Sequence, residues 1–348
     1  MSSLASFDSL PACDRLQTLL ANKAHLIADG AMGTNLFALG LQTGDAPELW
    51  NVDHPERLID LHGRMVAAGA DIILTNSFGG TRHRLKLHDA QDRVSELNSA
   101  AARLARQIAD AAGRPVLVAG SMGPTGEIME PIGELSADDA VAAFRDQAEA
   151  LAAGGVDVIW IETMSSREEA EAAIKGSLGT GLPIICTMTF DTNGRTMMGV
   201  TPEAAIEFYR DHEPGLAACG ANCGNGFGEL IAAVTGMHRA GTSNDPVLVA
   251  KGNCGIPEFV DGEIRYSGTP DVMKTYARMA ADAGARIIGG CCGSTPDHVR
   301  AMVEALEGYV PGEPPSLDGI RDTLGLNRAA GVDDGERPAR ARRSRRRS

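Results

Sequence analysis

Short apolar runs alternate with longer Ala-rich segments along most of the 348-residue chain, and this alternation constrains the fold more than any other feature. Each run is continuously apolar and rich in Val and Ile, which is typical of strands buried on both faces of a parallel sheet. The eight runs lie at residues 25–29, 71–76, 116–121, 156–162, 183–190, 216–222, 246–253 and 286–292. Strands alternating with helices predict an α/β fold.

The segments between the runs carry the apolar period of helices. They lie at residues 55–68, 94–112, 137–152, 167–175, 202–211, 228–240 and 270–283. Several end in Ala-Gly, as at Gly69, Gly154 and Gly284, which is a usual helix C-terminal signal. Eight strand-helix units favour a closed (β/α)8 barrel, or TIM barrel. The rival is an open dinucleotide-binding sheet, but residues 29–34 lack the G-x-G-x-x-G spacing that it requires.

The charge is unevenly distributed. The formal net charge is −14, yet seven of the last twelve residues are arginines, so the preceding residues carry −21. So acidic a body is a poor candidate for binding nucleic acid, which needs a basic surface. No stretch approaches the ~18 apolar residues of a membrane helix, and the start of the chain has no basic segment followed by an apolar one. We expect a soluble, cytoplasmic protein with no membrane partner.

The chain divides into three parts by composition. We expect an N-terminal extension at residues 1–21, the barrel at 22–312 and a C-terminal extension at 313–348. Residues 313–327 have the pattern of a short helix. Residues 328–348 have almost no large apolar side chain, which predicts a disordered, Arg-rich tail.

In a barrel, functional residues lie at the C-terminal ends of the strands. Cys223 follows the sixth run, and the adjacent pair Cys291 and Cys292 ends the eighth. Three converging thiolates would supply three corners of a tetrahedral zinc site and leave the fourth for substrate. Such a centre suits the binding of a substrate thiol as thiolate, and hence thiol alkylation. The alternative is that these cysteines are small buried hydrophobic residues.

The other cysteines favour packing. The odd total of seven argues against a disulfide framework. Cys13 precedes the barrel and Cys186 and Cys219 lie within strands, so we interpret all three as small buried residues. Cys254 directly follows the seventh run, where it is either a fourth thiol near a metal or, as we favour, another packed residue.

Two carboxylates also end predicted strands. Asp29 ends the first run and Glu162 the fourth, where they can serve as counter-ions for an amine or as structural caps. The amides of the turn from Gly30 to Thr34 can receive a carboxylate, because they lead into a helix. A thiol-bearing amino acid would satisfy the cysteines, the carboxylates and this turn together.

Two other functions remain open. Lys251 ends a strand and could form the Schiff base of a barrel lyase. Alternatively, the protein is a non-catalytic thiol-rich metal-binding or interaction protein that uses its Arg-rich tail for docking.

Six segments of the chain resemble a known family. They are DGAMGTNL at 29–36, ILTNSFGG at 73–80, GPTGE at 123–127, IET at 161–163, GANCG at 220–224 and GGCCGSTPDH at 289–298. In this order they resemble the zinc-dependent homocysteine S-methyltransferases, barrel enzymes that methylate homocysteine to methionine. The resemblance extends over roughly residues 22–307, which makes it more specific than one short motif.

The resemblance implies a site. Cys223, Cys291 and Cys292 would be the zinc ligands. The predicted substrate-binding residues are Asp29 and Glu162 for the amino group, Gly33 and Thr34 for the carboxylate, and Asn222 beside the first thiol. No protein nucleophile is assigned, because the zinc-bound substrate thiolate would attack the methyl group.

The methyl donor is open between two compounds. The resemblance allows glycine betaine or methylcobalamin carried by a separate corrinoid protein, as in a split methionine synthase module. Betaine enzymes hold the quaternary ammonium with aromatic side chains. The matching positions here are Gly79 and Thr163, and Trp50 is offset from the family's tryptophan. An acidic corrinoid protein is also the kind of partner on which the tail could dock.

Overall fold

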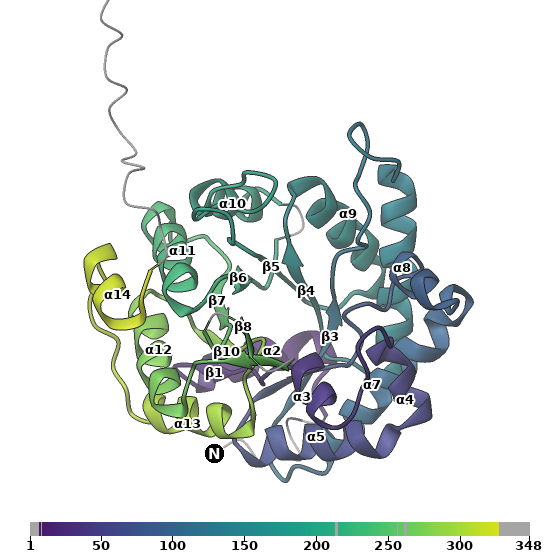
Figure 1. The fold of residues 1–348 in the computed structure, drawn as a ribbon, viewed down its shortest axis with the longest axis horizontal. Coiled ribbons are helices and arrows are strands. Elements are labelled where there is room, and N and C mark those ends of the chain that lie inside the picture. The colour runs from purple at the N-terminus through teal and green to yellow at the C-terminus, as the bar shows by residue number, and fades with distance from the viewer. Residues whose placement is uncertain (1–6, 8, 213–214, 256, 261–262, 327–348) are drawn as a thin grey trace, which may run out of the picture.

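The computed structural model describes residues 7, 9–212, 215–255, 257–260 and 263–326, in which eight parallel strands form a nearly closed barrel (Figure 1). The strands are β1 (Leu26–Ile27), β2 (Ile72–Leu74), β3 (Leu117–Met122), β4 (Val158–Met164), β5 (Ile184–Met188), β6 (Ala218–Cys223), β7 (Val247–Gly252) and β10 (Ile287–Gly290). Their order is β1-β10-β7-β6-β5-β4-β3-β2, and a bridge from Ala28 to Ile72 connects the two ends. The predicted (β/α)8 fold is confirmed.

Helices surround the barrel as an outer ring (Figure 1). They are α5 (Pro55–Ala67), α7 (Val94–Asp110), α8 (Ala137–Gly154), α9 (Arg167–Ser177), α10 (Pro202–Arg210), α11 (Phe227–Ala240), α12 (Pro270–Asp282) and α13 (Pro296–Leu306). Several begin at a Ser or Thr whose hydroxyl accepts a hydrogen bond from the third amide of the helix, as at Ser136, Ser166 and Thr269. In the described part of the chain, no helix is long and apolar enough to cross a membrane.

Smaller elements complete the described chain. Short helices α3 (Gly33–Ala38), α4 (Trp50–Asp53) and α6 (Arg82–Leu85) follow the first two strands. A hairpin of β8 (Pro257–Val260) and β9 (Glu263–Tyr266) follows β7, and the sequence pattern did not predict it. Helix α14 (Leu317–Leu324) confirms the short helix expected within 313–327. The tail predicted to be disordered, 328–348, lies outside the described residues.

Apolar side chains fill the barrel interior at the end opposite the polar strand ends. Every strand contributes to this cluster, whose strand residues include Leu26, Ile72, Leu117, Val158, Ile185, Ala218, Val249 and Ile287. Helix α2 (Ala12–Asn22) adds Leu16, Leu19 and Leu20 to the same cluster. The part of residues 1–21 that the structure describes therefore packs against one end of the barrel. The polar strand ends, which follow these residues along the chain, lie at the other end.

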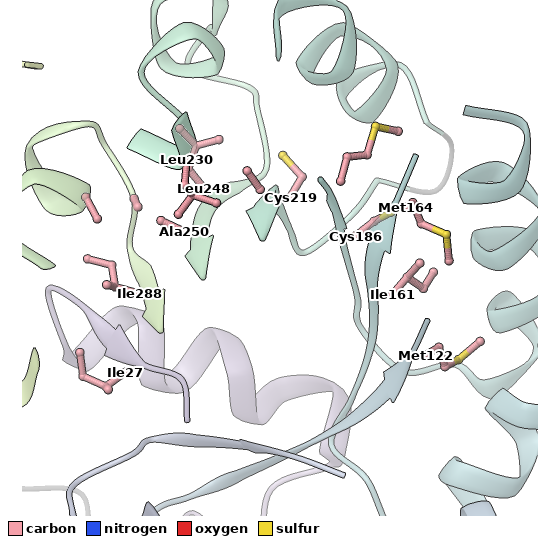
Figure 2. Packing of buried hydrophobic residues seen from close by; sticks show 14 of the residues in the cluster. Ile27, Met122, Ile161, Met164, Cys186, Cys219, Leu230, Leu248, Ala250 and Ile288 are labelled. Atoms are coloured by element: carbon pink, nitrogen blue, oxygen red, sulfur yellow. The ribbon is translucent and has the colours of Figure 1, made fainter. Parts of the chain in front are cut away.

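A second apolar layer lies between the strands and the outer helices. Figure 2 shows Cys186 and Cys219 among the aliphatic and methionine side chains of this layer. Both thiols are fully buried, which confirms that they act as packed residues. The same interpretation is wrong for Cys13, which is exposed because its position on α2 faces away from the barrel core.

Asp157 connects the start of β4 to two other elements. Its carboxylate is 1% exposed and accepts from Arg15 at 2.7 Å, from Arg106 at 2.8 Å and from the Val118 amide at 2.8 Å. We expect Asp157→Ala to lower the free energy of unfolding by about 3 kcal/mol, because it leaves a buried network without its anion.

Urea denaturation measures this loss. The control is Asp60→Ala, which breaks an exposed ion pair with Arg64 and should cost at most about 0.5 kcal/mol. Equal stability of the two variants would contradict a structural role for Asp157.

Candidate active site

Three thiols converge at the C-terminal end of the barrel. The Sγ atoms of Cys223, Cys291 and Cys292 all lie within 4.8 Å of one another, and the three side chains are half-buried. Cys223 is the last residue of β6, and the other two follow β10. The structure thus brings together the three cysteines that the sequence singled out. Cys254 is fully buried and is not part of this group.

Backbone turns with positive φ determine the direction in which these thiols project. Cys223 has φ of 62° and is followed by Gly224 at 82°, while Gly293 after the cysteine pair has φ of 79°. A residue other than glycine adopts this conformation at a cost of about 1–3 kcal/mol and keeps it only where its surroundings enforce it. The position of the Cys223 thiol is therefore imposed by the neighbouring segments.

Asn253, a residue that was not predicted to belong to the site, helps to hold Cys223 in this conformation. Its Nδ2 donates to the Gly224 carbonyl at 2.6 Å, and its Oδ1 accepts from the Cys292 amide at 3.0 Å. It therefore bridges the two turns that carry the thiols. Because Asn253 is 29 residues from one turn and 39 residues from the other in sequence, only the register of the strands could have revealed this bridge.

The thiols perturb one another. Hydrogen bonds among them shift each pKa in both directions, and burial together with their mutual repulsion leaves the pKa of Cys223 raised to about 11 and the pKa of Cys291 and Cys292 raised to about 12. Three thiolates this close repel one another unless a cation lies between them. A divalent metal removes that repulsion and deprotonates coordinating thiols outright. The donor set is therefore suited to a soft or borderline metal such as zinc.

Two buried carboxylates face the same end of the barrel interior. Asp29 is 1% exposed; its Oδ2 accepts from the Leu74 amide at 2.8 Å, whereas its Oδ1 is buried without a hydrogen-bond partner among the described residues. Burial raises the pKa of Asp29 to about 7, although Lys251 opposes this rise. Glu162 is 7% exposed and accepts from the Ser121 hydroxyl at 2.6 Å. The unpartnered Oδ1 is therefore an acceptor available to a cationic group.

The turn after β1 approaches the cysteine pair. Thr34 Oγ1 accepts from the Gly293 amide at 3.2 Å, so α3 and the turn that bears Cys292 are in contact. Nothing lies within 4 Å of the point where Gly33 would carry a Cβ. Gly33 thus borders open space, and the next residue, Thr34, contacts the turn that bears Cys292.

Asn222 lies beside Cys223 and is fully buried. Its Oδ1 accepts from the Thr163 amide at 2.8 Å and from the Thr187 hydroxyl at 2.7 Å, and its Nδ2 donates to the Thr163 hydroxyl at 2.7 Å. These bonds hold Thr163 at φ of 66°, an unusual value for a β-branched residue. Asn222 therefore connects β6 to the end of β4, and its role in substrate binding stays a prediction.

The positions that match the betaine cage have other environments. Thr163 is held by Asn222, and a Cβ on Gly79 would lie 3.0 Å from Oε1 of the buried Glu48. The described aromatic side chain that contacts the thiols is instead Tyr266 of β9, whose phenol is hydrogen-bonded to Cys292. Burial and the thiols raise the pKa of Tyr266. Tyr266 was not predicted to be part of the site, because it lies in the hairpin that the sequence pattern does not indicate.

Lys251 does not have the properties of a Schiff-base nucleophile. Burial opposes its charge, but Glu162, Cys291 and Asp29 outweigh this effect and raise the pKa of Lys251 above its ordinary value. A lysine nucleophile needs a lowered pKa and a neutral amine. The surroundings of Lys251 keep it an ammonium ion.

Comparison with known proteins agrees with this arrangement. The family model described as Homocysteine S-methyltransferase matches residues 26–306. The methionine synthase of Mycobacterium tuberculosis is 31% identical over 298 residues, which are 81% of this chain and 24% of that protein. The methionine synthase of Mycobacterium leprae is 31% identical over 319 residues, with coverages of 86% and 26%. The chain thus spans about a quarter of the length of these curated relatives.

A solved structure is similar over nearly its whole length. The metallated form of the homocysteine methyltransferase MmuM from Escherichia coli superposes with a TM-score of 0.68 at 26% identity, covering 82% of this chain and 98% of that chain. The family match includes every strand of the barrel and all three converging cysteines. The chain belongs to the homocysteine S-methyltransferase family.

Proposed function

We propose that this protein is a zinc-dependent homocysteine S-methyltransferase that forms methionine. The observation that carries the proposal is the convergence of three thiols within 4.8 Å at the barrel end where Asp29 holds a free carboxylate oxygen. A substrate with both a thiol and an ammonium group fits this pairing, and homocysteine has both. Membership of the family supports the same substrate.

Cys223, Cys291 and Cys292 would hold the zinc ion and leave its fourth position for the substrate. Bound zinc lowers the pKa of a thiol and keeps it as a thiolate at neutral pH. Asn253 holds the turns that carry these cysteines, so the three thiols stay converged before and after substrate enters.

The remaining site residues bind and orient the amino acid. Asp29 and Glu162 hold the ammonium group, and the turn at Gly33 and Thr34 receives the carboxylate. The substrate sulfur then attacks the methyl carbon in line with its leaving group. A sulfur–carbon bond forms, the bond between carbon and the donor atom breaks, and its electron pair leaves with the donor. The substrate thiol has already lost its proton, so no protein nucleophile is needed.

The donor is glycine betaine, which would leave as dimethylglycine, or methylcobalamin on a separate corrinoid protein, which would leave as cob(I)alamin. Tyr266 beside Cys292 supports a small cationic donor, because an aromatic face attracts a quaternary ammonium. The absence of aromatic side chains at 79 and 163 supports the corrinoid donor. We propose further that residues 22–312 form the catalytic barrel, flanked by extensions at 1–21 and 313–348.

Methionine formation distinguishes the donors. Zinc-loaded protein is supplied with homocysteine and either glycine betaine or methylcobalamin, and methionine is measured by mass spectrometry. Turnover with betaine alone identifies a betaine enzyme, and Tyr266→Leu should then raise the KM for betaine about fivefold or more. Turnover with methylcobalamin alone identifies a split methionine synthase module. Protein that binds neither zinc nor homocysteine would contradict the proposed function.

A further inference from the structure

Lys251 is a buried cation whose place in the site the proposed mechanism leaves unexplained. It lies on β7, is 3% exposed, and pairs in register with Asn222 on β6 and Gly289 on β10. Val249, two residues earlier, belongs to the interior cluster of the barrel. Because side chains alternate along a strand, Lys251 also projects into the barrel, one layer nearer to the thiols.

Because Gly289 has no side chain, the Lys251 side chain can extend past it toward β1. A Cβ on Gly289 would lie 3.3 Å from Lys251 Cγ and 2.8 Å from the Cβ of Ala28. The lysine side chain therefore runs over this glycine toward the end of β1, where Asp29 follows Ala28. A side chain at 289 would collide with Ala28 of the β1 end and crowd the Lys251 side chain.

The negative and positive charges around Lys251 do not cancel. Asp29 and Glu162 supply two carboxylates and Lys251 supplies one ammonium, so the three side chains together carry one negative charge when all are ionised. Lys251 faces Asp29 from β7 and Glu162 faces it from β4, and Cys291 at the end of β10 faces Lys251. Asp29 Oδ1 nevertheless has no hydrogen-bond partner among the described residues, so the lysine acts on it through its field.

We propose that Lys251 is a positioning residue for amine recognition: its charge, carried across Gly289, favours the carboxylate form of Asp29 and leaves Oδ1 free for the substrate's ammonium group. Without the lysine, the buried Asp29 would be largely protonated at neutral pH, because its pKa is about 7 even with Lys251 lowering it. Asp29, Glu162 and Lys251, which together carry one negative charge, become neutral as a group when one cation binds. This inference rests on the proposed function, since it requires homocysteine as the ligand.

Equilibrium binding of three thiol compounds to the zinc-loaded protein tests this inference. Homocysteine has both charged groups, 3-mercaptopropylamine lacks the carboxylate, and 4-mercaptobutyrate lacks the amine. In Lys251→Met at about pH 7, we expect the first two to bind about fivefold more weakly or worse, because a rise of one pKa unit from about 7 lowers the ionised fraction of Asp29 from about a half to about a tenth. The affinity for 4-mercaptobutyrate should change less than about twofold. The zinc content, measured by mass spectrometry, should stay at the wild-type value.

A double-mutant cycle tests the route through Asp29. In an Asp29→Asn background, Lys251→Met should change homocysteine affinity less than about twofold, because the group that it acts on is gone. Between about pH 7 and pH 8.5, the single Lys251→Met variant should regain affinity more steeply than the wild type, as Asp29 ionises. If Lys251→Met does not fold, Lys251→Gln serves for the same comparisons.

Three results would overturn the inference. They are an unchanged homocysteine affinity in Lys251→Met, an equal loss for 4-mercaptobutyrate, and full additivity with Asp29→Asn. Wild-type protein that binds zinc but not homocysteine would instead contradict the proposed function, and with it the ligand that the inference needs.

Discussion

Replacing Cys291 by alanine should remove zinc and methyl transfer together. Loss of an outer-shell partner alone lowers metal affinity about 10–100-fold, so loss of one of three thiol ligands should exceed about 100-fold. Methionine formation should fall by at least about a thousandfold, because the substrate thiol would keep its proton at neutral pH. Zinc content by mass spectrometry and turnover measured on the same preparation check both effects.

Cys254→Ala is the matched control for this variant. Its thiol is buried near the cysteine pair but lies outside the group of three, so the variant should keep one zinc per chain. A modest loss of stability, about 1 kcal/mol, is expected for removing a small buried side chain. Full activity of Cys291→Ala without metal would contradict the proposed role of the thiols, and loss of zinc in Cys254→Ala would assign the fourth thiol to the centre.

Replacing Asp29 by asparagine should weaken homocysteine binding about 10–100-fold, because a hydrogen bond to a charged group contributes about 1.5–3 kcal/mol. Zinc content should not change, since Asp29 lies outside the group of three thiols. The affinity for 4-mercaptobutyrate, which lacks the amine, should stay within about threefold of the wild type. An equal loss for both ligands would contradict amine recognition by Asp29.

The same variant should alter two pH profiles. Since the pKa of Asp29 is about 7, wild-type affinity for homocysteine should fall as the pH drops below that value, and Asp29→Asn should remove this dependence.

Ionisation of Asp29 should have the opposite effect on stability, which should decrease as the pH rises. The folded state holds the Asp29 proton up to about pH 7 and the unfolded state loses it near 3.8, so burial of Asp29 lowers the free energy of unfolding as the pH rises through this interval. Urea titrations of both proteins measure that difference.

Much of the fold could be predicted because strand and helix periods differ. Each of the eight apolar runs overlaps an observed strand, since a strand buried on both faces has no polar alternation to obscure it. The start of α8 follows from Ser136, which caps it as a helix N-terminal serine should. The β8–β9 hairpin escaped prediction because its strands are four residues each and alternate with charged residues.

The site was predictable only in part. Cys223, Cys291 and Cys292 end two strands, and the barrel alone brings such ends together. The roles of Asn253 and Asn222 depend on hydrogen bonds between strands, which no local pattern encodes. Cys13 was wrongly expected to be buried, because which face of α2 packs against the barrel is decided by tertiary contacts. The environment of Lys251 depends on the missing Cβ of Gly289, one strand away.

X-ray absorption at the zinc edge tests the central claim most directly. The spectrum of the zinc-loaded protein should fit three sulfur neighbours, the thiols of Cys223, Cys291 and Cys292. Adding homocysteine should raise the count to four, because the open position of the tetrahedron takes the substrate sulfur. A count that stays at three with homocysteine bound would contradict thiol activation at this centre.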